Sequence, residues 1–64
     1  MKYENNLLKR RTEIKKSPAL ILRESGVSKT AYYSYENGTH IPNIIKAIKL
    51  AEALDTSVYE LWSV

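Results

Sequence analysis

The sequence predicts an all-α domain built from five short helices. Only two prolines and two glycines interrupt its 64 residues, and between them apolar residues recur at the three- and four-residue spacing of an amphipathic helix. A chain of this length forms one small core at most, and the absence of cysteine excludes disulfide crosslinks. We therefore expect a single domain that covers residues 1–64.

The first predicted helix spans about Asn5 to Lys15. Its inner face carries three aliphatic residues, Leu7, Leu8 and Ile14. Arg11 lies four residues after Leu7 and three before Ile14, so it shares this inner face. A guanidinium inside a protein needs a carboxylate partner. The alternative is that only the aliphatic stem of Arg11 is covered while its charged end reaches solvent.

The second predicted helix begins after Ser17, which can serve as its N-cap. Pro18 then occupies the first helical position, where its missing N–H costs nothing. The helix continues through a short aliphatic run to Glu24.

A tight turn separates this helix from a third, predicted over about residues 29–36. Gly26 suits a turn residue with positive φ, and Ser28 can cap the third helix. Gly38 stands just beyond the helix end, as a C′ residue does. In a small basic protein, two helices joined by such a turn form the unit that places a recognition helix in a DNA groove.

Two further helices are predicted after a loop at residues 39–42. Asn43 can cap a helix over about Ile44 to Leu54. Its apolar face comprises Ile44, Ala47, Ile48, Leu50, Ala51 and Leu54, with Lys46, Lys49 and Glu52 opposite. Ser57 and Glu60 have the spacing of a capping box and begin a last short helix with Leu61 and Trp62.

The third helix has an inward and an outward face. Tyr32 and Tyr35 should pack inward, whereas Lys29, Thr30, Tyr33 and Ser34 share the outward face. Lysine can donate to guanine and threonine can contact a thymine methyl, so we expect these four residues to read bases. Ser28, Asn37, Thr39 and His40 flank the helix and are the expected contacts to backbone phosphates. The net charge of +3 has the sign needed to bind a polyanion. The alternative is that this outward face is only a solvent-exposed helix face that contacts no DNA.

Several motifs occur in the order and at the spacing of one protein family. They are Ser25-Gly26-Val27-Ser28, Tyr35-Glu36-Asn37-Gly38, Pro42, Leu50-Ala51-x-Ala53-Leu54 and Ser57-Val58-x-Glu60-Leu61. In these motifs the chain resembles the phage-repressor helix-turn-helix family, the Cro and C1-type or XRE-like regulators, from about Leu7 to Trp62. The resemblance implies a five-helix lambda-repressor-like fold with the helix-turn-helix at about residues 17–37. It also implies a small transcriptional repressor that binds double-stranded DNA, with Glu36 as the structural partner of Arg11.

Two residues of the second helix depart from the family pattern. The family usually has a phosphate-binding glutamine at the position of Pro18 and a small residue at the position of Leu22. Proline cannot make that phosphate bond, and leucine must separate the helices or fill a gap. These departures favour an alternative function, an antirepressor-like interaction module that binds a partner protein rather than DNA.

Composition argues against most other classes of function. With one histidine, one aspartate and no cysteine, and with isolated glycines, we expect no enzyme, metal site, cofactor or small-molecule ligand. The longest aliphatic run, Ala19-Leu20-Ile21-Leu22, is too short for a membrane span. The first residues contain no signal-peptide hydrophobic region. We therefore expect a cytoplasmic protein encoded by a bacterium, a phage or a mobile element.

The working species is expected to be a homodimer. A single short reading helix makes few base contacts, and related regulators bind two half-sites about one helical turn apart. Surplus apolar residues late in the chain are the expected interface: Ile45, Tyr59, Trp62 and Val64. The alternative for Trp62 is that it closes the core of its own monomer against the first helix.

Overall fold

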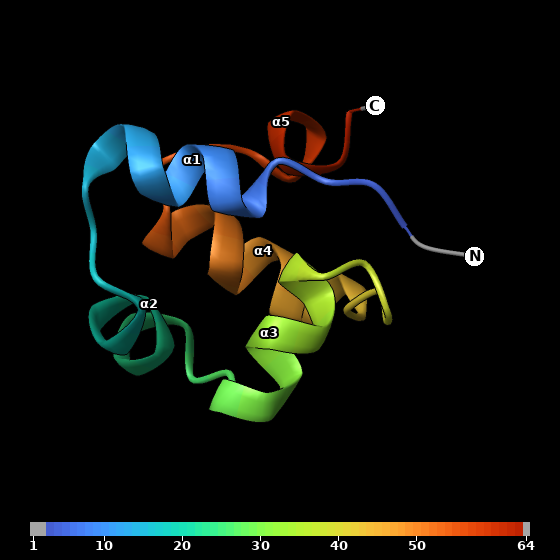
Figure 1. Cartoon of the computed structure of the whole chain (residues 1–64), viewed down its shortest axis with the longest axis horizontal. Coiled ribbons are helices and arrows are strands. Elements are labelled where there is room, and N and C mark those ends of the chain that lie inside the picture. The colour runs from blue at the N-terminus through green and yellow to red at the C-terminus, as the bar shows by residue number, and fades with distance from the viewer. Residues whose placement is uncertain (1–2, 64) are drawn as a thin grey trace.

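The computed structural model describes residues 3–63 and forms five helices in that range (Figure 1). They are α1 (Leu7–Ile14), α2 (Pro18–Ser25), α3 (Lys29–Glu36), α4 (Ile44–Ala53) and α5 (Val58–Trp62). Helix α4 packs against α2 and α5, and the view in Figure 1 has α1 and α5 on one side of it and α2 and α3 on the other. The predicted all-α, five-helix fold is confirmed. No helix among residues 3–63 has the length and apolar character needed to cross a membrane.

Four helices begin directly after the polar N-cap residues that the sequence indicates. The side chain of each cap accepts a hydrogen bond from the amide three residues later: Ser17 from Leu20, Ser28 from Ala31, Asn43 from Lys46 and Ser57 from Glu60. These bonds satisfy amides that have no partner within their own helix. The starts of α2, α3, α4 and α5 are therefore fixed by local chemistry.

Helix α1 is shorter than predicted at both ends. Asn5 and Asn6 were expected in the helix, but they lie before its first residue, Leu7. Their side chains donate to backbone carbonyls of distant segments, those of Tyr35 and Glu60 respectively. Asn5 Oδ1 also accepts the amide of Leu7 at 3.0 Å, a local bond that favours a turn or cap over a helix interior. The sequence pattern of α1 does not reveal the tertiary bonds.

The C-terminus of α1 has an unusual backbone conformation at Lys15. Its φ of 54° and ψ of 36° are left-handed, a region where a side chain costs about 1–2 kcal/mol. The amide of Lys15 donates to the Thr12 carbonyl and that of Lys16 to the Arg11 carbonyl, which closes the helix end. Glycine is the residue that usually occupies this position.

Replacing Lys15 by glycine should therefore stabilise the protein. We expect Lys15→Gly to raise the free energy of unfolding by about 0.5 kcal/mol, since the relief of strain exceeds the entropy that glycine adds to the unfolded chain. Urea denaturation followed by circular dichroism measures the change. Lys9→Gly, at an exposed site within α1, is the control and should lower stability by about 1 kcal/mol. Equal destabilisation by both variants would contradict the interpretation of Lys15.

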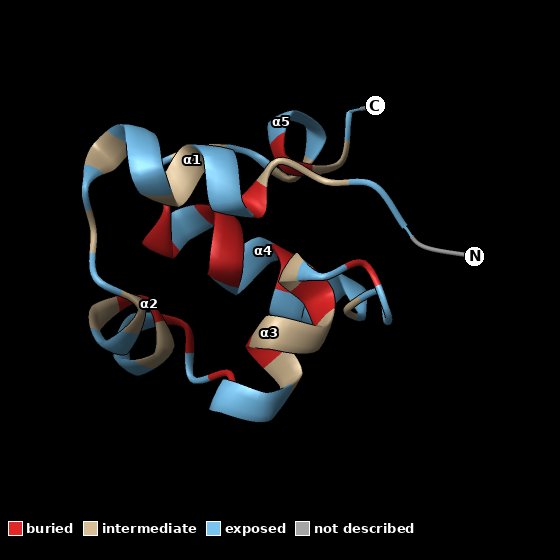
Figure 2. Cartoon of the chain, in the orientation of Figure 1, coloured by how far each residue is buried: buried red, intermediate tan, exposed pale blue. Residues whose placement is uncertain are grey.

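One hydrophobic cluster contains residues from all five helices. Figure 2 shows the buried faces turned toward the middle of the molecule. Tyr32 and Tyr35, which were predicted to pack inward, are both buried. The cluster comprises Leu7, Ile21, Val27, Tyr32, Tyr35, Leu50, Ala51, Ala53, Leu54 and Leu61.

Three aliphatic residues predicted on inner faces are exposed. Leu8 is 53% exposed, Ile44 63% and Ile48 43%, so the prediction was wrong for each. Leu8 follows Leu7 by about 100° of helix rotation, and Leu7 occupies the core position. The buried stripe of α4 is narrower than its apolar stripe, so Ile44 and Ile48, one turn apart, lie beyond its edge.

Two cations from the N-terminal part of the chain bind the C-terminus of α4. Arg10 donates from Nε to the Leu54 carbonyl and from Nη2 to the Asp55 carbonyl, both at 2.8 Å. Lys16 donates to the Ala53 carbonyl and also pairs with Glu24. Positive charge at a helix C-terminus is favourable, and these bonds satisfy terminal carbonyls. They tie α1 and the following loop to the central helix.

Candidate nucleic-acid interface

The turn between α2 and α3 is held by its own backbone and by one buried serine. Gly26 has φ 72° and ψ 11°, the left-handed conformation expected for it, and its amide donates to the Leu22 carbonyl at 2.9 Å. The hydroxyl of Ser25, which is 2% exposed, accepts a hydrogen bond from the amide of Val27. Val27 is itself buried in the core. The turn therefore holds α3 at a fixed orientation relative to α2.

The four expected base-reading residues lie on one side of α3, but they are not equally exposed. Lys29 and Thr30, in the first turn, are exposed. Tyr33 is half-buried, and its ring meets that of Tyr32 edge to face, with the ring centres 5.3 Å apart. The hydroxyl of Ser34 donates to the Ala31 carbonyl at 2.7 Å. The N-terminal end of α3 thus presents the most accessible polar groups.

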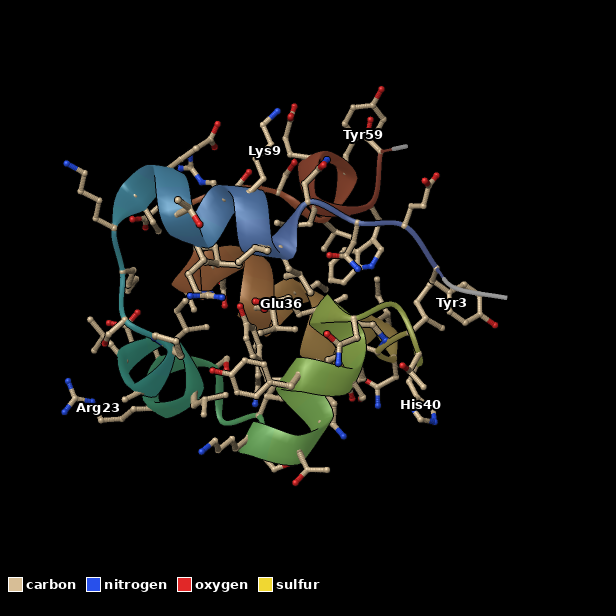
Figure 3. All side chains as sticks on the ribbon, in the orientation of Figure 1. Tyr3, Lys9, Arg23, Glu36, His40 and Tyr59 are labelled. Atoms are coloured by element: carbon tan, nitrogen blue, oxygen red, sulfur yellow. The ribbon has the colours of Figure 1, made fainter. Side chains whose placement is uncertain are left out.

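The residues expected to meet phosphates flank this helix on both sides. Ser28 is exposed, although its hydroxyl also caps α3. Asn37, Thr39 and His40 are exposed in the segment after α3, and Figure 3 shows His40 pointing outward from it. The amides of Thr39 and His40 both donate to the Ser34 carbonyl. This anchors the segment to the end of the helix.

An ion pair connects α3 to α1, and a tyrosine completes it. Arg11 donates from Nε and Nη2 to the two carboxylate oxygens of Glu36, at 3.2 and 3.1 Å. The Tyr32 hydroxyl donates to Glu36 Oε2 at 2.8 Å. The Glu36 side chain is 9% exposed and that of Arg11 20%, and Figure 3 shows Glu36 between the two helices. Two parallel bonds fix the pair in one geometry.

The same contacts shift two pKa values. The hydrogen bond to Glu36 raises the pKa of Arg11 above its ordinary value. Burial raises the pKa of the Tyr32 hydroxyl above its ordinary value, and the hydrogen bond to Glu36 adds to this effect. Tyr32 therefore keeps its proton and donates at neutral pH. Sequence reasoning missed this third member, although Tyr32 and Glu36 have the i, i+4 spacing of neighbours on a helix.

The two departures in α2 fit the fold. Pro18 stands at the first position of α2, as predicted. Leu22 is half-buried and packs against the hydrophobic cluster. The α2–α3 unit therefore forms with both residues in place.

The expected dimer residues have different surroundings. Ile45 is 58% exposed and Tyr59 75%, and Figure 3 shows Tyr59 pointing away from α5. Trp62 is half-buried and packs against the core, so it contributes to its own monomer. A shallow apolar pocket between α4 and α5 is lined by Ile41, Pro42, Ile44, Ala47, Val58 and Trp62. Val64 lies outside the described residues.

Comparison with known proteins agrees with this geometry. The helix-turn-helix family model matches residues 7–61. Over 61 residues the chain is 38% identical to the cryptic phage CTXphi transcriptional repressor RstR of Vibrio cholerae serotype O1, an alignment that covers 95% of this chain and 54% of that protein. The chain therefore spans about half the length of this curated relative. No solved structure matches the chain.

Proposed function

Because the chain belongs to the helix-turn-helix family, we propose that it binds specific sequences in double-stranded DNA and represses transcription. The observation that carries this proposal is the exposed polar end of α3, presented by the hydrogen-bonded turn at Gly26. Similarity to a transcriptional repressor over nearly the whole chain supports the regulatory role. We therefore propose that the protein is a regulator and not an enzyme. A bacterial or phage repressor acts in the cytoplasm, so we propose that location.

In the proposed complex, α3 enters the major groove with its N-terminal end toward the bases. Lys29 donates to a guanine, and Thr30 contacts a thymine methyl or donates to a base edge. Tyr33 and Ser34 lie further along the same side, where the half-buried tyrosine ring can contact sugars or a methyl group. Residues at the N-terminal end of a recognition helix are the usual base contacts in this motif.

Phosphate contacts on both sides of α3 would fix its position in the groove. Ser28, Asn37, Thr39 and His40 supply polar side chains there, and the first-turn amides of α2 and α4 add partial positive charge. Such contacts do not depend on sequence. They make the affinity fall as salt rises, because each neutralised phosphate releases counterions.

Binding of a labelled random-sequence duplex, followed by fluorescence anisotropy over a range of salt concentrations, tests this function. We expect measurable binding at low salt that weakens linearly on a double logarithmic plot. Absence of binding at the lowest salt, with the protein folded, would overturn the proposal. It would favour the alternative, a module that binds a partner protein.

We also propose that the chain acts as a homodimer through the end formed by α4 and α5. Ile45 and Tyr59 are large hydrophobic residues that are exposed, and their burial against a second copy would favour association. In sedimentation equilibrium at micromolar concentration we expect the wild type to be a dimer and Ile45→Asp to be a folded monomer. Leu8→Asp is the matched control, because Leu8 is similarly exposed but lies on α1. A wild type that stays monomeric even on a palindromic duplex would refute the dimer.

A further inference from the structure

The segment before α1, residues 3–6, runs along the C-terminal ends of two helices that are far apart in sequence. We call it the N-terminal strap. Figure 1 shows it passing between α5 and the loop after α3. The hydrogen bonds that it makes there are donated to backbone carbonyls at the two helix ends.

Toward α3, the strap binds two backbone carbonyls. The amide of Tyr3 donates to the Gly38 carbonyl at 2.7 Å, and Asn5 Nδ2 donates to the Tyr35 carbonyl at 2.8 Å. The Tyr35 carbonyl also accepts the amide of Gly38, so both of its acceptor positions are used. A Cβ atom at Gly38 would overlap the Tyr3 carbonyl oxygen. The strap is therefore seated directly against the end of the proposed reading helix.

Toward α5, the strap binds the last turn of the helix. The amide of Asn6 donates to the Leu61 carbonyl at 2.7 Å, and Asn6 Nδ2 donates to the Glu60 carbonyl at 2.8 Å. Carbonyls at a helix C-terminus have no partner within the helix. Two consecutive asparagines thus tie the end of α3 to the end of α5.

Both polar atoms of the Asn5 side-chain amide form hydrogen bonds. While its Nδ2 donates to α3, its Oδ1 accepts the amide of Leu7, the first residue of α1, at 3.0 Å. This fixes which way the amide group points. Asparagine suits the position because it carries a donor and an acceptor on one short side chain.

From these bonds we propose that Asn5 and Asn6 are positioning residues that hold α5 in a fixed relation to α3. In a dimer joined near α5, this relation sets the distance between the two reading helices, and hence the half-site spacing that the protein prefers. The inference rests on the proposed DNA-binding dimer. It assigns spacing selectivity to a segment that need not touch DNA.

The test uses Asn5→Asp and Asn6→Asp, which keep the side-chain shape and one acceptor but remove the Nδ2 donor. Affinity is measured on a palindromic duplex with the preferred spacing and on duplexes with one base pair added or removed. We expect the wild type to lose about tenfold or more in affinity when the spacing changes. Each variant should discriminate several-fold less between spacings, whatever its absolute affinity.

Lys9→Gly is the stability control, because it weakens α1 without touching the strap and should keep the wild-type spacing preference. If an aspartate variant does not fold, the corresponding serine variant, which adds no charge, replaces it. Wild-type spacing selectivity in both strap variants, with DNA binding and dimerisation intact, would overturn the positioning role alone. Failure of the wild type to bind duplex DNA would instead overturn the proposed function, and the positioning role with it.

Discussion

Glu36→Gln is expected to lower the free energy of unfolding by about 3 kcal/mol, because it leaves a mostly covered guanidinium without its counter-charge. The carboxylate accepts two bonds from Arg11 and one from Tyr32, and its side chain is 9% exposed. Glutamine keeps the shape but presents one donor toward groups that are themselves donors. A domain of 64 residues has little stability to spare, so the loss should be plain in thermal and urea denaturation.

Glu13→Gln provides the matched control for this substitution. Glu13 faces Arg10 at 3.8 Å on the surface of α1, with 52% of its side chain exposed. An exposed pair of this kind contributes little, so the control should change stability by less than about 0.5 kcal/mol. Similar melting temperatures for the Glu36→Gln protein and the wild type would show that the network does not hold α3 in place.

Lys29→Ala is expected to lose about 1–3 kcal/mol of discrimination at one base position, since its ammonium group is the proposed donor to a guanine. Lys29 is exposed at the first turn of α3. By contrast, His40→Ala should weaken binding to all sequences about equally, because a phosphate contact carries no base information. Competition assays with each base pair of a preferred site replaced in turn distinguish the two patterns.

Lys9→Ala is the control for the charge that Lys29→Ala removes. Lys9 projects from α1 on the side of the molecule away from the start of α3 (Figure 3). Its loss should leave base discrimination unchanged. If Lys29→Ala and Tyr33→Ala both keep the wild-type affinity and preference, α3 is not the reading helix.

Local signals account for how well the fold could be predicted. Ser17, Ser28, Asn43 and Ser57 each cap the helix that follows, and a cap depends only on residues within one turn. Gly26 and Gly38 adopt the positive φ that their positions indicate. The helix starts therefore follow from short-range chemistry that a sequence displays directly.

Contacts across the fold account for what could not be predicted. Arg10 and Lys16 have the composition of a solvated basic surface, yet both bind carbonyls at the end of α4. Asn5 and Asn6 have a helical context but bind α3 and α5 instead. In the candidate site, the packing of Tyr33 on Tyr32 likewise depends on how α3 meets the core. Periodicity indicates which residues share a face, but not which partner meets them.

Selection of bound sequences from a random pool of duplex DNA tests the central claim, that α3 reads specific DNA sequences, most directly. We expect the wild type to enrich two related short half-sites, arranged with two-fold symmetry and centred about one helical turn apart. Selected duplexes should bind far more tightly than the starting pool at the same salt concentration. A pool that stays unenriched, or selected duplexes that bind no better than random ones, would contradict the claim.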